Sequence, residues 1–217
     1  MIEESERALV VTIDPATKDN IAYWAGRLRP ETNGGGCRVQ DLVWDKFALP
    51  KRDADAYVQK RLLEDEKDIF DRATDIDIEL QNPTQFVPGA KRLFAGNIRS
   101  HTLSRSLALA IRARRRALGL PEPNIRFSHP RTKFFTLGFD CPKKKSDRKR
   151  LSVKIQDAFF RTHSNDRSYD SWRQRYETHF LDPKTNRTKK DDAADVRTAG
   201  IARFVRMRAG LDRKKRK

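Results

Sequence analysis

The spacing of apolar and polar residues along the chain predicts a mixed order of strands and helices. Residues 8–13 (ALVVTI) are almost continuously apolar, which is typical of a strand buried on both faces. Pro15 ends this strand, and a short turn leads to a second apolar run at 21–25, so we expect a hairpin. A third strand is expected at 42–49, and a short fifth strand at 124–128.

The fourth predicted strand, 75–81, has a different pattern because its apolar and polar residues alternate strictly. Its apolar face carries Ile76, Ile78 and Leu80, and its polar face carries Asp77, Glu79 and Gln81. The strand therefore turns carboxylates toward one side of the predicted sheet.

Two long helices separate these strands. Residues 53–73 have apolar residues at helical spacing, which predicts one amphipathic helix that crosses back over the sheet. A second helix is expected at 100–118, closed by Gly119. Its inward residues are predicted to be Leu103, Leu107, Ile111 and Leu118, and its outward residues Arg105, Arg112, Arg115 and Arg116. Residues 152–160 and 169–180 are also predicted to be helical, and 182–190 to be the loop before the last helix.

The last helix begins in an acidic segment, KKDDAADV (189–196). Asp192 and Asp195 are three residues apart, so a helix places both carboxylates on neighbouring parts of one face. The apolar stripe predicted beside them consists of Thr198, Ile201, Ala202 and Val205. Asp191 is interpreted as a first-turn cap, whereas Asp195 lies beside the stripe, where an unpaired carboxylate is costly.

The two parts of the chain differ in the sign of their net charge. The 217 residues carry a formal net charge of +17. Residues 1–90 contain 12 Lys and Arg against 18 Asp and Glu, and residues 91–217 contain 35 against 12. A basic second half favours a polyanionic partner, and nucleic acid explains it better than a membrane, since no run approaches the ~20 apolar residues of a spanning helix.

The strongest basic stretch is 131–150, where aromatic residues are interleaved with the charges. Its basic side chains include Lys133, Lys143, Lys144, Lys145, Arg148 and Arg150. One interpretation is a solvated loop anchored by its aromatics; we favour contact with a nucleic-acid backbone. The acidic start MIEESERALV is unlike a signal peptide, so we expect a soluble intracellular protein in the cytoplasm, nucleus or virion.

The candidate catalytic residues are acidic residues at the ends of two predicted strands and at the start of the last predicted helix. Asp14 ends the first strand, Glu79 ends the fourth, and Asp192 and Asp195 open the last helix. If the first and fourth strands are parallel neighbours, their ends share one edge of the sheet. Carboxylates gathered there repel one another unless divalent cations hold them, and oxygen ligands suit Mg²⁺ or Mn²⁺. Two such ions can activate a water and stabilise the leaving oxygen of a phosphodiester.

At this point the residues resemble a known family, the RuvC-like Holliday-junction resolvases of the ribonuclease-H-like superfamily. The sequence resembles especially the branch of this family that is found in poxviruses and other large DNA viruses, together with its fungal mitochondrial relatives. Three motifs carry the resemblance, TIDPATK in the first strand, DIELQ in the fourth and KKDDAADV at the last helix. The resemblance implies a mixed five-stranded α/β sheet flanked by helices, in a single nuclease domain at 1–208 followed by a basic tail at 209–217.

The resemblance also implies a function. We expect a structure-selective endonuclease that resolves four-way DNA junctions with two metal ions, in recombination or viral genome concatemer processing. Asp14, Glu79, Asp192 and Asp195 are expected to bind two Mg²⁺ ions, which Mn²⁺ can replace. Lys149 is the first choice for the basic catalytic residue, with Lys133 second. Symmetric cutting of two strands implies a homodimer, and no membrane or small-molecule cofactor is expected.

Two alternatives stay open at this point. One is another ribonuclease-H-like nuclease, of the RNA–DNA hybrid or transposase type. The other is a basic DNA-binding protein without activity, in which the acids are helix caps and surface charges.

Overall fold

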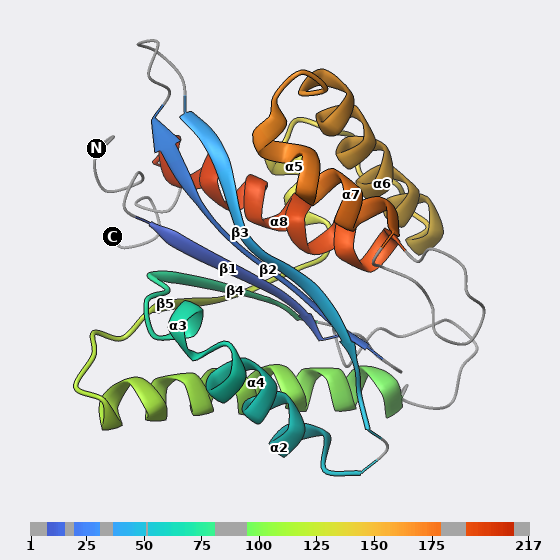
Figure 1. The fold of residues 1–217 in the computed structure, drawn as a ribbon. Coiled ribbons are helices and arrows are strands. Elements are labelled where there is room, and N and C mark those ends of the chain that lie inside the picture. The colour runs from blue at the N-terminus through green and yellow to red at the C-terminus, as the bar shows by residue number, and fades with distance from the viewer. Residues whose placement is uncertain are drawn as a thin grey trace.

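A computed structural model describes residues 8–15, 20–30, 37–50, 52–80, 95–178 and 190–210. Five strands form one mixed sheet in the order β3-β2-β1-β4-β5 (Figure 1). The strands are β1 (Leu9–Pro15), β2 (Asn20–Pro30), β3 (Cys37–Ala48), β4 (Asp75–Glu79) and β5 (Asn124–Ser128). The first three are antiparallel neighbours, and β1, β4 and β5 run parallel. The predicted α/β class and the parallel pairing of β1 with β4 are therefore confirmed.

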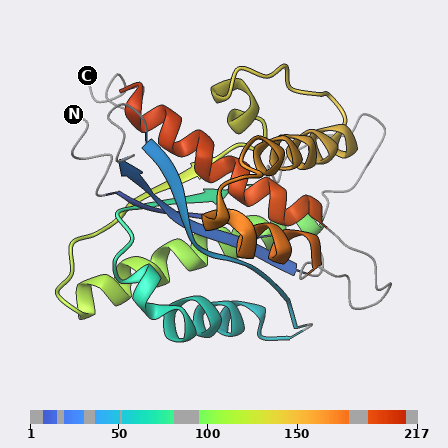
Figure 2. The same cartoon turned by 45° about the horizontal axis from the view of Figure 1, so that its top comes forward.

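Helices cover both faces of the sheet (Figure 1). One face is covered by α2 (Ala54–Gln59), the π-helical segment η1 (Lys60–Asp65), α3 (Lys67–Phe70) and α4 (Ala95–Ala117). The other face is covered by α5 (Thr132–Thr136), α6 (Lys145–Thr162), the 3₁₀ turn η2 (Arg167–Tyr169), α7 (Asp170–Thr178) and α8 (Lys190–Arg208). Figure 2 shows α8 crossing the sheet, with α6 packed alongside it.

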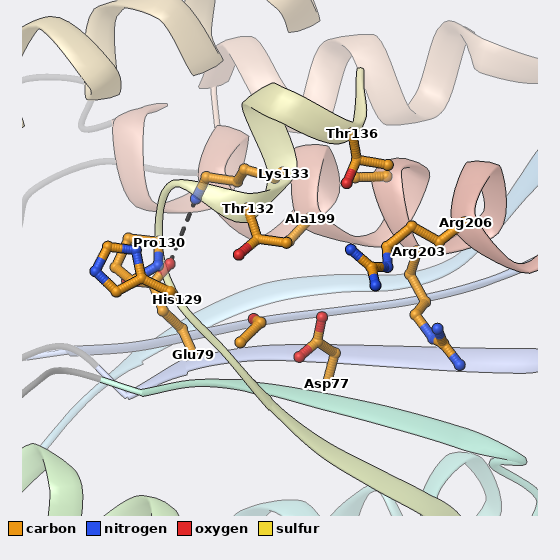
Figure 3. Close-up of a pocket in the computed structure, with 12 residues that line it drawn as sticks. Asp77, Glu79, His129, Pro130, Thr132, Lys133, Thr136, Ala199, Arg203 and Arg206 are labelled. Atoms are coloured by element: carbon orange, nitrogen blue, oxygen red, sulfur yellow. Dashed lines mark hydrogen bonds and ion pairs between the residues drawn. The ribbon is translucent and has the colours of Figure 1, made fainter. Parts of the chain in front are cut away.

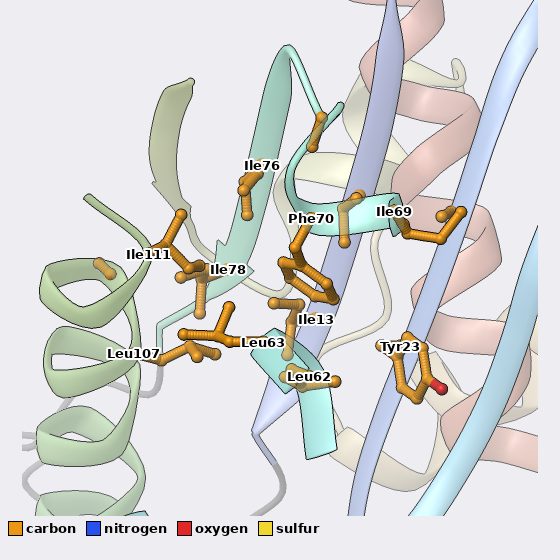
Figure 4. Packing of buried hydrophobic residues seen from close by; sticks show 14 of the residues in the cluster. Ile13, Tyr23, Leu62, Leu63, Ile69, Phe70, Ile76, Ile78, Leu107 and Ile111 are labelled. Atoms are coloured by element: carbon orange, nitrogen blue, oxygen red, sulfur yellow. The ribbon is translucent and has the colours of Figure 1, made fainter. Parts of the chain in front are cut away.

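The sheet separates two cores, and strand β1 contributes to both, as its nearly unbroken apolar sequence predicts. Leu9, Val11 and Ile13 face the α4 side, where they pack with Ile76 and Ile78 of β4 (Figure 4). The intervening residues of both strands face the α8 side. The face on which the acids of β1 and β4 lie is thus the face covered by α8.

Several predicted details are wrong in instructive ways. The single helix expected at 53–73 is broken at Glu66, where the side chain accepts a hydrogen bond of 2.9 Å from Tyr23 Oη. Before the break, the wider π-helical turn buries Leu62 and Leu63 together. On α8, Val205 is 40% exposed rather than part of the buried stripe, because α8 faces the sheet mainly with other residues.

Two orientations predicted for α4 are also wrong. Leu118 was expected to face the core, but α4 ends before it and its side chain is 50% exposed. Arg115 was expected to face solvent, but it is buried and donates to the backbone carbonyls of Pro121 and Phe70. A guanidinium has enough donors to satisfy carbonyl groups that the short helix α3 leaves open.

Some expectations fall outside the described residues. These are the turn at 16–19, Gln81, most of the loop at 182–190, the last two residues of the predicted helix 169–180, and the tail from 211 onward. No helix in the described ranges is both long and apolar enough to cross a membrane. The division into a domain at 1–208 and a tail at 209–217 stays a prediction.

Candidate active site

Parallel pairing of β1 and β4 brings Asp14 and Glu79 together. Thr12 pairs with Asp77 and Ile13 with Ile78, so Asp14 and Glu79 are the next residues of the two strands. Helix α4 fixes these ends from the opposite face. Ser100 Oγ donates to the Pro15 carbonyl at 2.6 Å, and Ser104 Oγ donates to the Glu79 carbonyl at 3.4 Å.

Helix α8 delivers the third carboxylate because two strands hold its first turns. Thr12 Oγ1 donates to the Val196 carbonyl at 2.7 Å, and Trp44 Nε1 donates to the Ala193 carbonyl at 2.9 Å. The two carbonyls belong to the residue after Asp195 and to the residue two positions before it. Further on, Gly200 lies so close to the Trp24 ring that a Cβ atom there would overlap it. The helix therefore approaches the sheet with little freedom to shift.

Asp14, Glu79 and Asp195 converge at this edge of the sheet. One carboxylate oxygen from each lies within 4.8 Å of the other two. Burial raises the pKa of Asp14 well above its usual value, and the negative charges of Glu79, Asp192 and Asp195 raise it further. Asp14 Oδ1 is buried and has no hydrogen-bond partner among the described residues. Such a cluster is electrostatically unfavourable by itself and suits a cation.

These three carboxylates form a site that can hold a divalent metal ion. Hard oxygen ligands from several carboxylates are the donors that Mg²⁺ and Mn²⁺ prefer. The unpartnered Oδ1 of Asp14 could serve as a ligand atom, because it has no competing donor in the described part of the chain.

Lys133 extends from α5 into the same cluster (Figure 3). Its Nζ lies 3.1 Å from Asp195 Oδ1 and 3.4 Å from Glu79 Oε2, and the side chain is only 5% exposed. Burial alone would lower the pKa of Lys133, but the charges of Asp195, Glu79 and Asp14 outweigh it and raise the pKa above its usual value. Lys133, expected first as a DNA contact, thus carries a fixed positive charge inside the acidic cluster.

Lys149 lies beside the cluster rather than within it. Its Nζ lies 2.6 Å from Asp191 Oδ2 and 2.6 Å from Asp192 Oδ1. Asp192 is buried and close enough to raise the pKa of Asp14, but it is not one of the three converging carboxylates. Asp191, interpreted from sequence as a first-turn cap, also shares Lys149 with Asp192. Its pKa is lowered because the hydrogen bond and charge of Lys149, together with backbone hydrogen bonds in the first turn of α8, outweigh its burial.

Sequence reasoning missed Ser152, whose Oγ donates to Asp195 Oδ1 inside the protein. It also missed Arg197, which is fully buried and forms an ion pair with Asp41 at 2.7 Å. The guanidinium carbon of Arg197 lies 4.1 Å from the centre of the Phe159 ring. No local motif marks either residue, because their partners are distant in sequence and come together only when α6, β3 and α8 pack.

A small hollow of about 20 Å³ lies beside the carboxylates. Its walls come from β4, β5, α5 and α8 and include Asp77, Glu79 and Lys133 (Figure 3). Arg203 and Arg206 of α8 also line it. A second, smaller hollow shares Asp77 and Glu79 with it and reaches Asp14 and Asp195.

The remaining basic residues predicted to contact DNA lie outside this hollow. Lys143, Lys144, Lys145 and Arg150 are exposed, at the start of α6 or just before it. Arg148 is half-buried and donates to the carbonyls of Pro142 and Lys143 at 3.2 Å and 2.6 Å. Four of these five basic side chains are therefore exposed to solvent, whereas Arg148 hydrogen-bonds the backbone just before α6.

The order of the sheet, the parallel β1–β4 pair and the crossing helix α8 give the chain a RuvC-like α/β fold. The chain is similar to the yeast mitochondrial Holliday junction resolvase Ydc2, with a TM-score of 0.54 and 15% identity over 95% of this chain and 83% of that one. It is also similar to RuvC from Thermus thermophilus, with a TM-score of 0.50 and 13% identity over 93% of this chain and 96% of that one. No protein-family model matches the chain, and no curated protein matches it in sequence.

Proposed function

We propose that this protein is a metal-dependent, structure-selective endonuclease that resolves four-way DNA junctions. The observation that carries the proposal is the meeting of Asp14, Glu79 and Asp195, within 4.8 Å, at one edge of a RuvC-like sheet. Ydc2, which has a similar fold, is described as a Holliday junction resolvase. The basic second half of the chain supports a DNA substrate.

In this proposal Asp14, Glu79 and Asp195 hold divalent cations, with Asp192 as a further ligand of a second ion. Mg²⁺ is the proposed ion, and Mn²⁺ is expected to replace it. Bound there, two such ions would lower the pKa of a water and stabilise the leaving 3′ oxygen.

Two lysines are proposed to assist the reaction, one by its positive charge and the other by orienting a carboxylate. Lys133 is already held among the carboxylates and stays protonated, so it supports charge that grows on a phosphate placed there. This placement favours Lys133 over Lys149 as the catalytic lysine. Lys149 contacts Asp192, so we assign it the task of orienting that carboxylate.

Lys143, Lys144, Lys145 and Arg150 are proposed to contact DNA phosphates away from the reacting bond. Charge-neutral replacement of the three lysines should flatten the salt dependence of junction binding, by roughly 0.9 in the log–log slope for each phosphate that is no longer neutralised. An unchanged slope would remove this loop from the DNA interface. Because two strands must be cut symmetrically, we also propose that the protein acts as a homodimer.

A substrate comparison tests the proposed function. The wild-type protein is incubated with a labelled four-way junction, an RNA–DNA hybrid and a linear duplex, each with Mg²⁺ or with EDTA. We expect Mg²⁺-dependent paired nicks in the junction only. Preferred cutting of the hybrid or the linear duplex would indicate another ribonuclease-H-like nuclease, and tight junction binding without cutting would indicate a non-catalytic DNA-binding protein.

A second experiment separates the two lysines. Lys133→Ala should slow single-turnover cutting of bound junction by at least 100-fold while junction affinity changes little, because a charge beside the reacting phosphate acts mainly in the transition state. Lys149→Ala should raise the Mg²⁺ concentration needed for cutting. If only Lys149→Ala slows single-turnover cutting at saturating Mg²⁺, then Lys149 rather than Lys133 is the catalytic lysine.

A further inference from the structure

One face of α6 contacts the acidic end of α8 along about two turns. Lys149, Ser152 and Gln156 are spaced so that they lie on the same side of α6. Lys149 meets Asp191 and Asp192, Ser152 meets Asp195, and Gln156 meets Thr198 and Arg197. A segment that sequence suggested only as basic and partly helical therefore supports every acid of α8.

The contact between Ser152 and Asp195 is the one that reaches the metal site. The Ser152 side chain is fully buried, and its hydroxyl donates to Asp195 Oδ1. Lys133 Nζ lies 3.1 Å from the same oxygen. Two donors on one oxygen restrict rotation of the carboxylate about its Cβ–Cγ bond. Of the two, only Ser152 is uncharged, so it can remain in place without repelling a cation.

We propose that Ser152 is a positioning residue that holds the Asp195 carboxylate in the orientation required to bind metal, and so sets the metal affinity of the site. The inference rests on the proposed function, because it assumes that Asp195 is a metal ligand. Partners that orient a ligating carboxylate typically change metal affinity by about 10–100-fold when they are removed. Ser152 is not one of the three converging carboxylates and acts on them only through Asp195, so its effect should appear in metal binding itself.

Gln156 provides a matched control. It lies about one turn further along the same face of α6, is equally buried, and contacts the same helix. Its Nε2 lies 2.9 Å from Thr198 Oγ1, and its Oε1 accepts a hydrogen bond from Arg197. Neither partner is one of the converging carboxylates. Removing Gln156 should therefore weaken the packing of α6 on α8 without disturbing the metal ligands.

The test uses the full chain without DNA. Mn²⁺ binding is measured by calorimetry for the wild-type protein, Ser152→Ala and Gln156→Ala, and thermal unfolding is followed in EDTA for all three. Ser152→Ala should weaken Mn²⁺ binding by about 10–100-fold, whereas Gln156→Ala should lower the unfolding temperature and leave Mn²⁺ affinity at the wild-type value.

Wild-type affinity in Ser152→Ala, or an equal loss of affinity in Gln156→Ala, would overturn the assignment. A wild-type protein that binds no Mn²⁺ would overturn both this inference and the proposed metal centre. A protein that binds Mn²⁺ and shows the Ser152 effect but does not cut junctions would leave the inference standing and refute the proposed substrate. The two proposals therefore fail in different measurements.

Discussion

The two faces of the sheet are stabilised by different means. On the α4 face, buried aliphatic and aromatic side chains of β1, β4, α3 and α4 pack against one another (Figure 4). On the α8 face, apolar packing is combined with buried ion pairs, Arg197 with Asp41 and Arg203 with Asp75. Apolar packing tolerates small shifts, whereas hydrogen-bonded charges fix direction. The face that holds α8 in register is the face that carries the candidate site.

The ion pair between Arg197 and Asp41 is expected to give the largest effect on stability. Arg197→Met should lower the free energy of unfolding by about 3–5 kcal/mol, because it leaves the Asp41 carboxylate buried without its cation. Urea unfolding measures the change. The double variant Arg197→Met with Asp41→Asn removes both charges and should recover part of the loss; a double variant less stable than the sum of both single changes would refute this account.

The matching change on the α4 face is Leu107→Ala. Leu107 is 1% exposed in the hydrophobic core on this face, so its truncation should cost about 3 kcal/mol through lost burial and a cavity. Because Leu107 is on the opposite face from α8, Mn²⁺ affinity at temperatures below the transition should not change. A large loss of metal affinity in the folded variant would show that the two faces are coupled.

Gly200→Ala tests how closely α8 approaches the sheet. The added methyl group would overlap the Trp24 ring, which is itself packed against Gly26, so we expect a loss of about 2 kcal/mol from overpacking. Unfolding of the single variant and of its combination with Trp24→Leu measures the coupling between the two sites. Additive losses would mean that the ring is not the obstacle.

The smallest expected effect comes from Asp71 and Arg114, at the rim of the α4 face. Arg114 Nη2 lies 2.5 Å from Asp71 Oδ2, and its hydrogen bond lowers the pKa of Asp71 despite partial burial. The pair therefore stabilises the fold above the unfolded-state pKa of about 4, and this contribution is lost as pH falls through the lowered pKa of the folded state.

Asp71→Asn should thus cost about 1 kcal/mol at neutral pH. Its difference from wild type should shrink when urea unfolding is repeated below about pH 4. A difference that is constant with pH would show that the charge of Asp71 contributes nothing.

The parts of the fold that depend on local pattern were predictable from sequence. The alternation predicted at 75–81 identified which face of β4 carries acids, and the helical crossover between β1 and β4 permitted the parallel pairing that the structure shows. These two steps placed Asp14 and Glu79 together, and the acidic start of α8 supplied Asp195. Each step uses residues close in sequence or a general rule of chain connection.

The parts that depend on packing at long range were not predictable. Lys133 and Lys149 occur in the same basic stretch of the sequence. Only the packing of α5 and α6 shows that Lys133 lies among the three carboxylates and that Lys149 contacts Asp192 instead. The sequence pattern predicted that Arg115 is exposed, because nothing in it indicates the carbonyl of Phe70, at the end of α3, as one of its partners. Hydrogen bonds of this kind join residues more than 40 positions apart and leave no periodic signal.

We propose that the acids at the ends of β1 and β4 and near the start of α8 act as one metal-dependent cutting centre. The most direct test of this claim is single-turnover cleavage of a labelled four-way junction by wild type, Glu79→Gln and the control Asp191→Asn, over a range of Mg²⁺ concentrations. We predict Mg²⁺-dependent paired nicks for wild type and nearly the same rate for Asp191→Asn, with no detectable cutting by Glu79→Gln although it still binds the junction. Cutting by Glu79→Gln at the wild-type rate, or no Mg²⁺-dependent cutting by wild type, would contradict the claim.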